Sequence, residues 1–215
     1  MKKKNRFLLS FLLGLAAVAA GCAGAHYSLV PDYRGRIPRS IAIMPVLNEA
    51  VNLRVGEEFR PLLHQKVALK GYEALALSTI DGRLLEKGIR EPGQVHSLTA
   101  QELGKLLGTD ALLYTTVTEF NTAYLVAYSS ITVGARFELR DSRSGEKLWE
   151  SDHEVKERKL GVDKSSARDA ASFAALRSYH PYIQQVINAS FATLPDGPNA
   201  PGAPSRGSVL PAGGK

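Results

Sequence analysis

Cys22, the only cysteine in this 215-residue sequence, has the position that most clearly predicts a chemical role. It follows a positively charged start and an apolar stretch over residues 7–20, and small residues up to Gly21 close that stretch. The stretch is shorter than the ~20 residues that span a bilayer. This order is typical of an export signal that is removed from the mature protein. We therefore expect residues 1–21 to be a lipoprotein signal peptide, cleaved between Gly21 and Cys22.

The residues that end in Cys22 resemble a lipobox, at which bacterial lipoproteins receive a diacylglyceryl group on the cysteine. Gly21 and Cys22 fit this pattern, whereas Ala19 stands where leucine is usual. The alternative is a leftover cysteine, but a free exposed thiol is a liability on an exported protein. Several acyl chains together hold a protein durably on a membrane. Because Ala23 is not the aspartate typical of inner-membrane retention, we expect Cys22 to anchor the protein in the outer membrane.

The sequence contains no catalytic or metal-binding motif. The histidines are not spaced as metal ligands, and a lipidated cysteine leaves no thiolate for a metal; they are His26, His64, His96, His153 and His180. The nucleophile elbow, the phosphate-binding loop and the dinucleotide glycine motif are all missing. We therefore expect no metal, no cofactor and no enzymatic activity. Carboxylates that converge only in the folded chain would escape this search.

Tyr124 and Tyr128 are the candidate interface residues, and we expect them in one short strand. They stand in a segment of low charge beside Thr122, Ser129 and Ser130. Tyrosine is over-represented at protein interfaces. Cross-strand packing within a sheet is the alternative role for both residues.

The charge of the sequence argues against a nucleic-acid partner. The formal charge is +6, but the signal segment carries four basic residues and no acidic one, so the mature chain carries +2. The remaining charges alternate in sign, whereas nucleic-acid-binding proteins keep a concentrated basic face. We expect no nucleic-acid partner.

Residues 39–194 carry the apolar patterns of one folded domain. Short apolar runs predict strands over residues 40–46, 72–77 and 110–120. Apolar residues at helical spacing predict helices over residues 57–70 and 99–107. Thr99 and Glu102 have the spacing of a capping box at the start of the second helix. Because helices connect these strands, we expect the strands to be parallel.

The second half of this domain predicts an antiparallel meander followed by a helix. Apolar and polar residues alternate over residues 131–140, which indicates a strand with one face in water. We expect a turn at 141–145, a returning strand at 147–155, a loop at 156–165 and a helix towards Leu194 that kinks or splits at His180-Pro181. The predicted class is α/β (α+β): a mixed sheet with early parallel strands, an antiparallel meander, helices packed on it and a C-terminal helix.

Both ends of the mature chain have the composition of extended segments. Residues 22–38 contain Gly, Pro, Tyr and Arg without apolar periodicity, so we expect a lipid-anchored tether. Residues 195–215 are rich in Pro and Gly, with four prolines at every third position. We expect a disordered tail there, because such compositions do not build a packed core.

The assembled motifs resemble a family of proteobacterial lipoproteins of unknown function, domain of unknown function 799. The resemblance rests on residues 41–46 with Pro45 and Asn48, on Gly71-Tyr72, on residues 108–114, and on residues 141–145 followed by Leu148-Trp149. It implies an α/β domain similar to the N-terminal domain of TolB and to CsgG-type periplasmic domains. It also implies an outer-membrane location without catalytic residues.

Three functions remain in view. The leading expectation is a non-enzymatic accessory or assembly factor that binds envelope proteins, among them a CsgG-like lipoprotein or a second copy of the chain. The alternative is a solute-binding lipoprotein that serves a transporter. The third is a small periplasmic hydrolase, which would need polar groups with shifted pKa values in a cleft.

Overall fold

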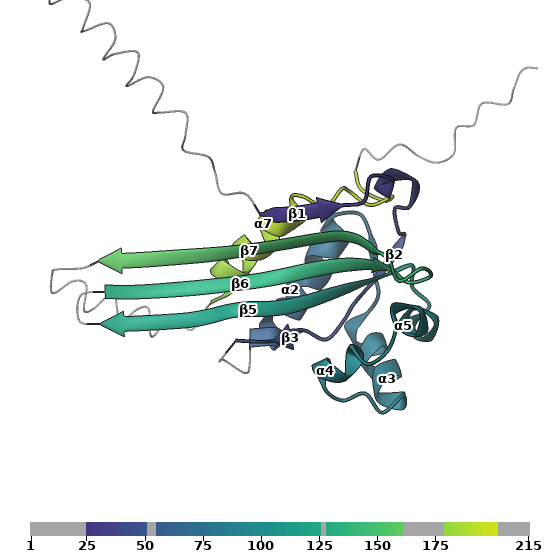
Figure 1. Ribbon diagram of the computed structural model, residues 1–215, viewed down its shortest axis with the longest axis horizontal. Helices are drawn as coiled ribbons and strands as arrows, with labels where there is room; N and C mark the ends of the chain where they lie inside the picture. The colour runs from purple at the N-terminus through teal and green to yellow at the C-terminus, as the bar shows by residue number, and fades with distance from the viewer. Residues whose placement is uncertain (1–24, 51–54, 126–127, 161–178, 202–215) are drawn as a thin grey trace, which may run out of the picture.

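The computed structural model describes residues 25–50, 55–125, 128–160 and 179–201. Seven strands form one mixed sheet in the order β1-β7-β6-β5-β2-β4, and β3 also pairs with β5 (Figure 1). The strands are β1 (His26–Leu29), β2 (Ser40–Ile43), β3 (Leu47–Asn48), β4 (Glu73–Ala74), β5 (Ala111–Leu125), β6 (Tyr128–Asp141) and β7 (Lys147–Leu160). Signal peptide and Cys22 lie outside the described residues. No helix within the described ranges is long and apolar enough to cross a membrane.

The sheet combines parallel and antiparallel pairing. β2 is parallel to β4 and to β5, and β3 is parallel to β5. β5, β6 and β7 form an antiparallel meander, and β1 adds to the outer edge of β7. The predicted class, a mixed sheet with early parallel strands, helices packed on it and a C-terminal helix, is confirmed.

The larger hydrophobic core lies between the sheet and two helices, α2 (Val55–Leu69) and α7 (His180–Phe191). α2 presents Phe59, Leu63 and Val67 to this core. Trp149 of β7 is fully buried in it and packs edge-to-face on Phe191, with 5.4 Å between the ring centroids. Pro61 lies inside α2.

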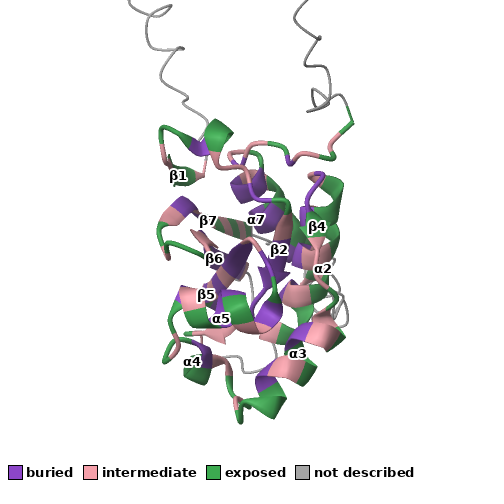
Figure 2. Cartoon of the chain, turned by 90° about the vertical axis from the view of Figure 1, so that its right-hand side faces the viewer, coloured by how far each residue is buried: buried purple, intermediate pink, exposed green. Residues whose placement is uncertain are grey.

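A second, smaller core lies between the sheet and three short helices, α3 (Leu77–Glu86), α4 (Pro92–Val95) and α5 (Ala100–Leu107). Residues of β2, with Met44 directly after it, alternate between the two cores: Ile41 and Ile43 belong to the first, and Ala42 and Met44 to the second. This alternation follows from the two-residue period of a strand. Helices therefore cover both faces of the parallel part of the sheet, and Figure 2 shows the buried positions gathered on β2, β6 and α7.

The antiparallel meander is covered on one face only. Its inward residues on β6 are buried, and they are Ile131, Val133, Ala135, Phe137 and Leu139. The alternating residues from Arg136 to Arg140 lie on the opposite face and are exposed or half-buried. The predicted face in water is therefore present at Arg136, Glu138 and Arg140, whereas Thr132 and Gly134 of the same face are buried.

Two sequence expectations in this region differ from the structure, and two helices were not expected. The chain after β4 forms α3 and α4, which the sequence patterns did not reveal. Residues 156–160 continue β7 instead of forming a loop. Tyr124 and Tyr128 do not share a strand, because β5 runs on to Leu125 and β6 begins at Tyr128. The helix expected from residue 166 lies outside the described residues up to 178, and α7 begins at His180 with Pro181 in its first turn, where proline is well tolerated.

The two expected extended segments are partly folded onto the domain. Residues 26–29 form β1, and Tyr33, in the helical turn η2 (Tyr33–Gly35), is buried in the larger core. At the other end, the amides of Gly197 and Asn199 donate to the carbonyls of Lys70 and Gly71, at 2.7 and 3.0 Å. The ordered domain therefore reaches further in both directions than residues 39–194, because one buried tyrosine and a few backbone hydrogen bonds fix these segments.

Candidate functional site

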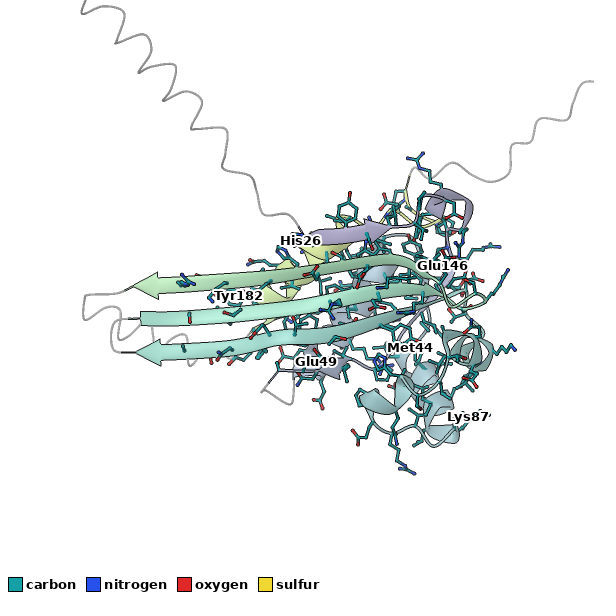
Figure 3. The ribbon with its side chains drawn as sticks, viewed as in Figure 1. His26, Met44, Glu49, Lys87, Glu146 and Tyr182 are labelled. Carbon is teal, nitrogen blue, oxygen red and sulfur yellow. The ribbon has the colours of Figure 1, made fainter. Side chains whose placement is uncertain are left out.

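A groove of ≈ 450 Å³ lies on the uncovered face of the meander, between β5 and β6 on one side and the α4–α5 segment on the other. Figure 1 shows α4 and α5 below the right-hand end of the sheet, where β5 begins and β6 ends beside the β6–β7 turn. The lining comes from four places in the sequence: His96, Leu98, Thr99, Ala100 and Gln101; Tyr114 and Thr116; Arg136, Glu138 and Arg140; Ser144 and Gly145. Glu146, labelled in Figure 3, marks the end of the sheet at this turn.

The floor of the groove is a set of polar side chains on two neighbouring strands. Tyr114 pairs with Glu138 across the ladder, and Thr116 pairs with Arg136. Directly opposite residues of an antiparallel pair project from the same face of the sheet. The sequence therefore places two hydroxyls and three charged groups, counting Arg140, within one small surface.

The charges on this floor are partly paired. The Arg140 guanidinium donates through Nη2 and Nε to Oε2 of Glu138, at 2.6 and 3.1 Å. Lys147 Nζ lies 3.7 Å from the same carboxylate and 2.8 Å from Glu150. Glu138 is thus neutralised by two neighbouring cations, a fork-shaped pairing that also holds Arg140 in place.

Arg136 and Tyr114 are not paired in this way. Among the described residues, neither side chain makes a hydrogen bond or an ion pair, and Asp152 lies opposite Arg136 in β7 without joining it. Burial raises the pKa of Tyr114 to about 12, so its hydroxyl stays protonated at neutral pH. The His96 ring packs against Tyr114 with 5.5 Å between centroids. The groove therefore offers a free guanidinium and a phenol to a ligand.

The helical wall of the groove is fixed by the start of α5. Thr99 Oγ1 accepts from the Glu102 amide, and Glu102 Oε2 accepts from the Thr99 amide at 2.8 Å, so the predicted capping box is confirmed. Gln101 Nε2 donates to the Ser144 carbonyl at 2.7 Å. Gly104 lets α5 approach the β6–β7 turn, because a Cβ at this position would collide with Ser142. These contacts hold α5 against the strands.

The β6–β7 turn closes one end of the groove. Asp141 Oδ1 accepts from the amides of Arg143 and Ser144, both at 2.8 Å, and from Ser144 Oγ at 3.1 Å. Burial on its own would raise the pKa of Asp141, but the hydrogen bonds from Ser144 and Arg143 outweigh it and hold the pKa below its usual value. Gly145 has φ of 77°, the left-handed conformation that the predicted turn requires.

Two hydroxyl–carboxylate contacts stand at the rim, Thr99–Glu102 and Ser144–Asp141. Hydrogen bonds from Thr99 hold the pKa of Glu102 below its usual value, as those at the turn do for Asp141. A carboxylate with a lowered pKa is a weak base, so neither pair activates its hydroxyl as a nucleophile at neutral pH. Within the described ranges, no group of histidine and carboxylate side chains could hold a metal ion.

The residues predicted from sequence do not form this groove. Gly21 and Cys22 lie outside the described residues. Tyr124 and Tyr128 flank the β5–β6 hairpin turn, ten or more positions along β5 from Tyr114, and their side chains are not among those described. The groove residues on β6 carried a signal, since they are the polar partners of the alternating pattern. No sequence pattern predicted that His96 and Gln101 would lie beside that strand.

Fold and site together thus define a class of protein: a mixed-sheet α+β domain with a polar groove beside its antiparallel meander. The chain belongs to the family described as "Putative lipoprotein GNA1162-like", whose model matches residues 27–190.

Three relatives illustrate the likeness. "Putative lipoprotein NMB1124/NMB1162" of Neisseria meningitidis serogroup B is 29% identical over 151 residues, which cover 68% of this chain and 70% of that protein. The crystal structure of lipoprotein GNA1162 from Neisseria meningitidis has 26% identity and a TM-score of 0.55, over 64% of this chain and 96% of that chain. The PelC dodecamer from Paraburkholderia phytofirmans has 12% identity and a TM-score of 0.47, over 78% and 96% of the two chains. Membership of a lipoprotein family agrees with the lipid anchor expected from the sequence, whereas the likeness to TolB and CsgG-type domains stays a prediction.

Proposed function

We propose that this protein is a non-enzymatic accessory lipoprotein of the outer membrane, which binds envelope proteins through the groove between α5 and the meander. Family membership supports the lipoprotein part. The lipobox supports acylation of Cys22, and Ala23 in the following position supports sorting to the outer membrane.

One observation carries the binding role: the groove holds two polar side chains without hydrogen-bond partners among the described residues, beside neighbours that are held by hydrogen bonds. Arg136 and Tyr114 are free among the described residues, while Glu138, Arg140 and Gln101 are held. Arginine and tyrosine are enriched where proteins bind each other. A frame that does not rearrange keeps the cost of binding low. We expect the partner to be an envelope protein, either a CsgG-like lipoprotein or a second copy of this chain.

The fold favours this role over the solute-binding alternative. The described residues form one sheet with two layers of helices, rather than two lobes that could close over a solute. The groove is open along β5 and β6 and bordered by charged side chains, which suits a protein segment better than an enclosed small molecule.

Photo-crosslinking in living cells tests the groove. A benzophenone amino acid replaces exposed His96 inside the groove, and in a matched strain it replaces Leu85 on α3, which is 52% exposed and outside the groove. We expect protein adducts from position 96 and none from position 85, with Arg136→Glu abolishing the former. Adducts that are equal at both positions, or that are insensitive to Arg136→Glu, would contradict the proposal.

Membrane fractionation tests the anchor and its sorting separately. We expect Cys22→Ala to leave the membrane fraction, because the acyl chains have no other attachment. We expect Ala23→Asp to move the protein from the outer-membrane to the inner-membrane band of a density gradient. A Cys22→Ala protein that stays fully in the membrane fraction would show that the lipid anchor is wrongly assigned.

A further inference from the structure

The link between the lipid and the folded domain is very short. Only residues 23–25 separate Cys22 from His26, the first residue of β1. Even a fully extended chain spans at most about 3.6 Å per residue, so His26 lies within roughly 14 Å of Cys22. If Cys22 is acylated, as the proposed function requires, the membrane surface lies next to the start of β1.

β1 is firmly paired with the rest of the sheet, so the short distance between Cys22 and His26 also keeps the folded domain close to the membrane. It pairs with β7 from His26 opposite Asp152 to Leu29 opposite Trp149, and the Val30 amide donates to the Leu148 carbonyl at 3.1 Å. Three residues later, the Tyr33 side chain enters the core and its hydroxyl lies 2.8 Å from that of Tyr72. An edge held at both ends in this way does not swing out to lengthen the link.

Two exposed side chains of β1 and η2 have the chemistry of a membrane-facing surface. Tyr27 of β1 is 59% exposed and is the one large aromatic residue so exposed among those described. Arg34 in η2 is exposed, and its guanidinium makes no hydrogen bond or ion pair within the described ranges. Tyrosine places its ring and hydroxyl at the level of lipid headgroups. Arginine extends its charge to lipid phosphates from an apolar stem.

The helical wall of the binding groove lies away from this edge, whereas the turn end of the groove, at Ser144, lies beside Arg36, the residue that follows η2. In Figure 3 His26 lies on the upper edge of the sheet, and Lys87, which follows α3, lies at the lower edge. α4 and α5, which wall the groove, lie on the lower side with α3 (Figure 1). A membrane against β1 therefore leaves the α4–α5 wall of the groove in the aqueous space.

We propose that the β1–η2 edge, with Tyr27 and Arg34, rests on the lipid headgroups, and that the α4–α5 wall of the groove consequently faces away from the membrane. The inference rests on the proposed anchor at Cys22 and adds an orientation to it. The partner of this edge is a phospholipid surface, which the covalently attached lipid keeps within reach.

Spin labels on single introduced cysteines test this orientation, because an acylated Cys22 leaves no other thiol in the chain. The lipidated mature protein is reconstituted in vesicles of phosphatidylethanolamine and phosphatidylglycerol. The labels replace Tyr27 on the edge and, as matched controls, Leu85 on α3 and Leu69 on α2, both exposed. Collision rates are measured with oxygen, which concentrates in lipid, and with a nickel chelate, which stays in water.

We expect the ratio of oxygen to nickel collisions to be several-fold higher at Tyr27→Cys than at Leu85→Cys and Leu69→Cys. Equal ratios at the three positions, in protein that floats with the vesicles, would overturn the orientation and leave the anchor intact. A Tyr27→Cys label that neither reagent reaches would overturn it too, since protein would then cover the edge. Protein that does not float with the vesicles would instead overturn the anchor.

Discussion

The buried phenols of Tyr33 and Tyr72 join three distant parts of the chain. Tyr72 Oη donates to the Pro195 carbonyl at 2.6 Å, so the hydrogen between the two phenols comes from Tyr33. Burial raises the pKa of Tyr33 to about 12, and burial together with Tyr33 raises that of Tyr72 further. Both groups therefore stay protonated in any physiological medium. This tyrosine node fixes the N-terminal segment, the end of α2 and the C-terminal segment at one point.

Removing one hydroxyl of the node tests its contribution. We expect Tyr72→Phe to lower the free energy of unfolding by about 2 kcal/mol, because the Tyr33 hydroxyl and the Pro195 carbonyl both lose a partner. Urea denaturation at neutral pH measures the change. Tyr27→Phe, which removes an exposed hydroxyl, should leave the midpoint unchanged. An equal midpoint for Tyr72→Phe and the wild type would contradict the role of the node.

Asp141 gives the β6–β7 turn a dependence on pH. We expect Asp141→Ala to destabilise the protein by about 1 kcal/mol at pH 7, since three hydrogen bonds lose their acceptor. Folding lowers the pKa of this carboxyl, so its stabilisation is complete above the unfolded value of about 3.9 and is lost as the pH falls through the folded value. The difference in the free energy of unfolding between Asp141→Ala and wild type, measured by urea denaturation, should therefore be smaller at pH 3 than at pH 7. A difference that stays constant between pH 7 and pH 3 would count against this account.

At the scale of elements, the sequence predicted those features whose formation depends on residues close together in the chain. The alternation in β6, the capping box at Thr99 and the turn at Asp141 were all recognisable because each depends on neighbouring residues. α3 escaped because Ala76 supplies no side-chain cap and Gly82 interrupts its interior, although Ile80 and Leu84 share one buried face. Its helical form depends on packing against Met44 and Leu112, which are distant in sequence.

Two glycines around α3 should respond in opposite ways to the same change. Gly82 lies inside the helix, where an added Cβ meets no atom within 4 Å, so we expect Gly82→Ala to stabilise the protein by about 0.5–1 kcal/mol. Gly88 has equal space but φ of 78°, so Gly88→Ala should destabilise by about 1 kcal/mol. Thermal unfolding of the two variants measures both effects. If both variants changed the unfolding temperature in the same direction, the backbone conformation at Gly82 and Gly88 would not be what determines the effect.

At the scale of the whole molecule, the groove could not be predicted from the sequence. Its lining comes from residues 96–101, 114–116, 136–140 and 144–145, which come together through the packing of α5 on the second core and against the β6–β7 turn. The ends of the domain were misjudged for a similar reason. β1 and the segment after Leu194 lack apolar periodicity because their edges are held by backbone hydrogen bonds rather than by apolar faces.

Shortening the C-terminus locates the end of the folded domain. We expect a mature chain that ends after Pro201 to unfold at the same urea concentration as the full mature chain. A chain that ends after Leu194 should lose about 2–3 kcal/mol, because the hydrogen bonds of Pro195, Gly197 and Asn199 and the Lys70–Asp196 ion pair disappear. Equal stability of the two shortened chains would contradict the docked segment.

The tyrosine node also determines how the domain carries mechanical force. The described chain begins and ends on the same side of the molecule (Figure 1), and Tyr33 and Tyr72 connect these two ends directly. Tension applied between the two ends would therefore run through β1, the two phenols and Pro195. The hydroxyl of Tyr72, which contacts both ends, would carry this load between them.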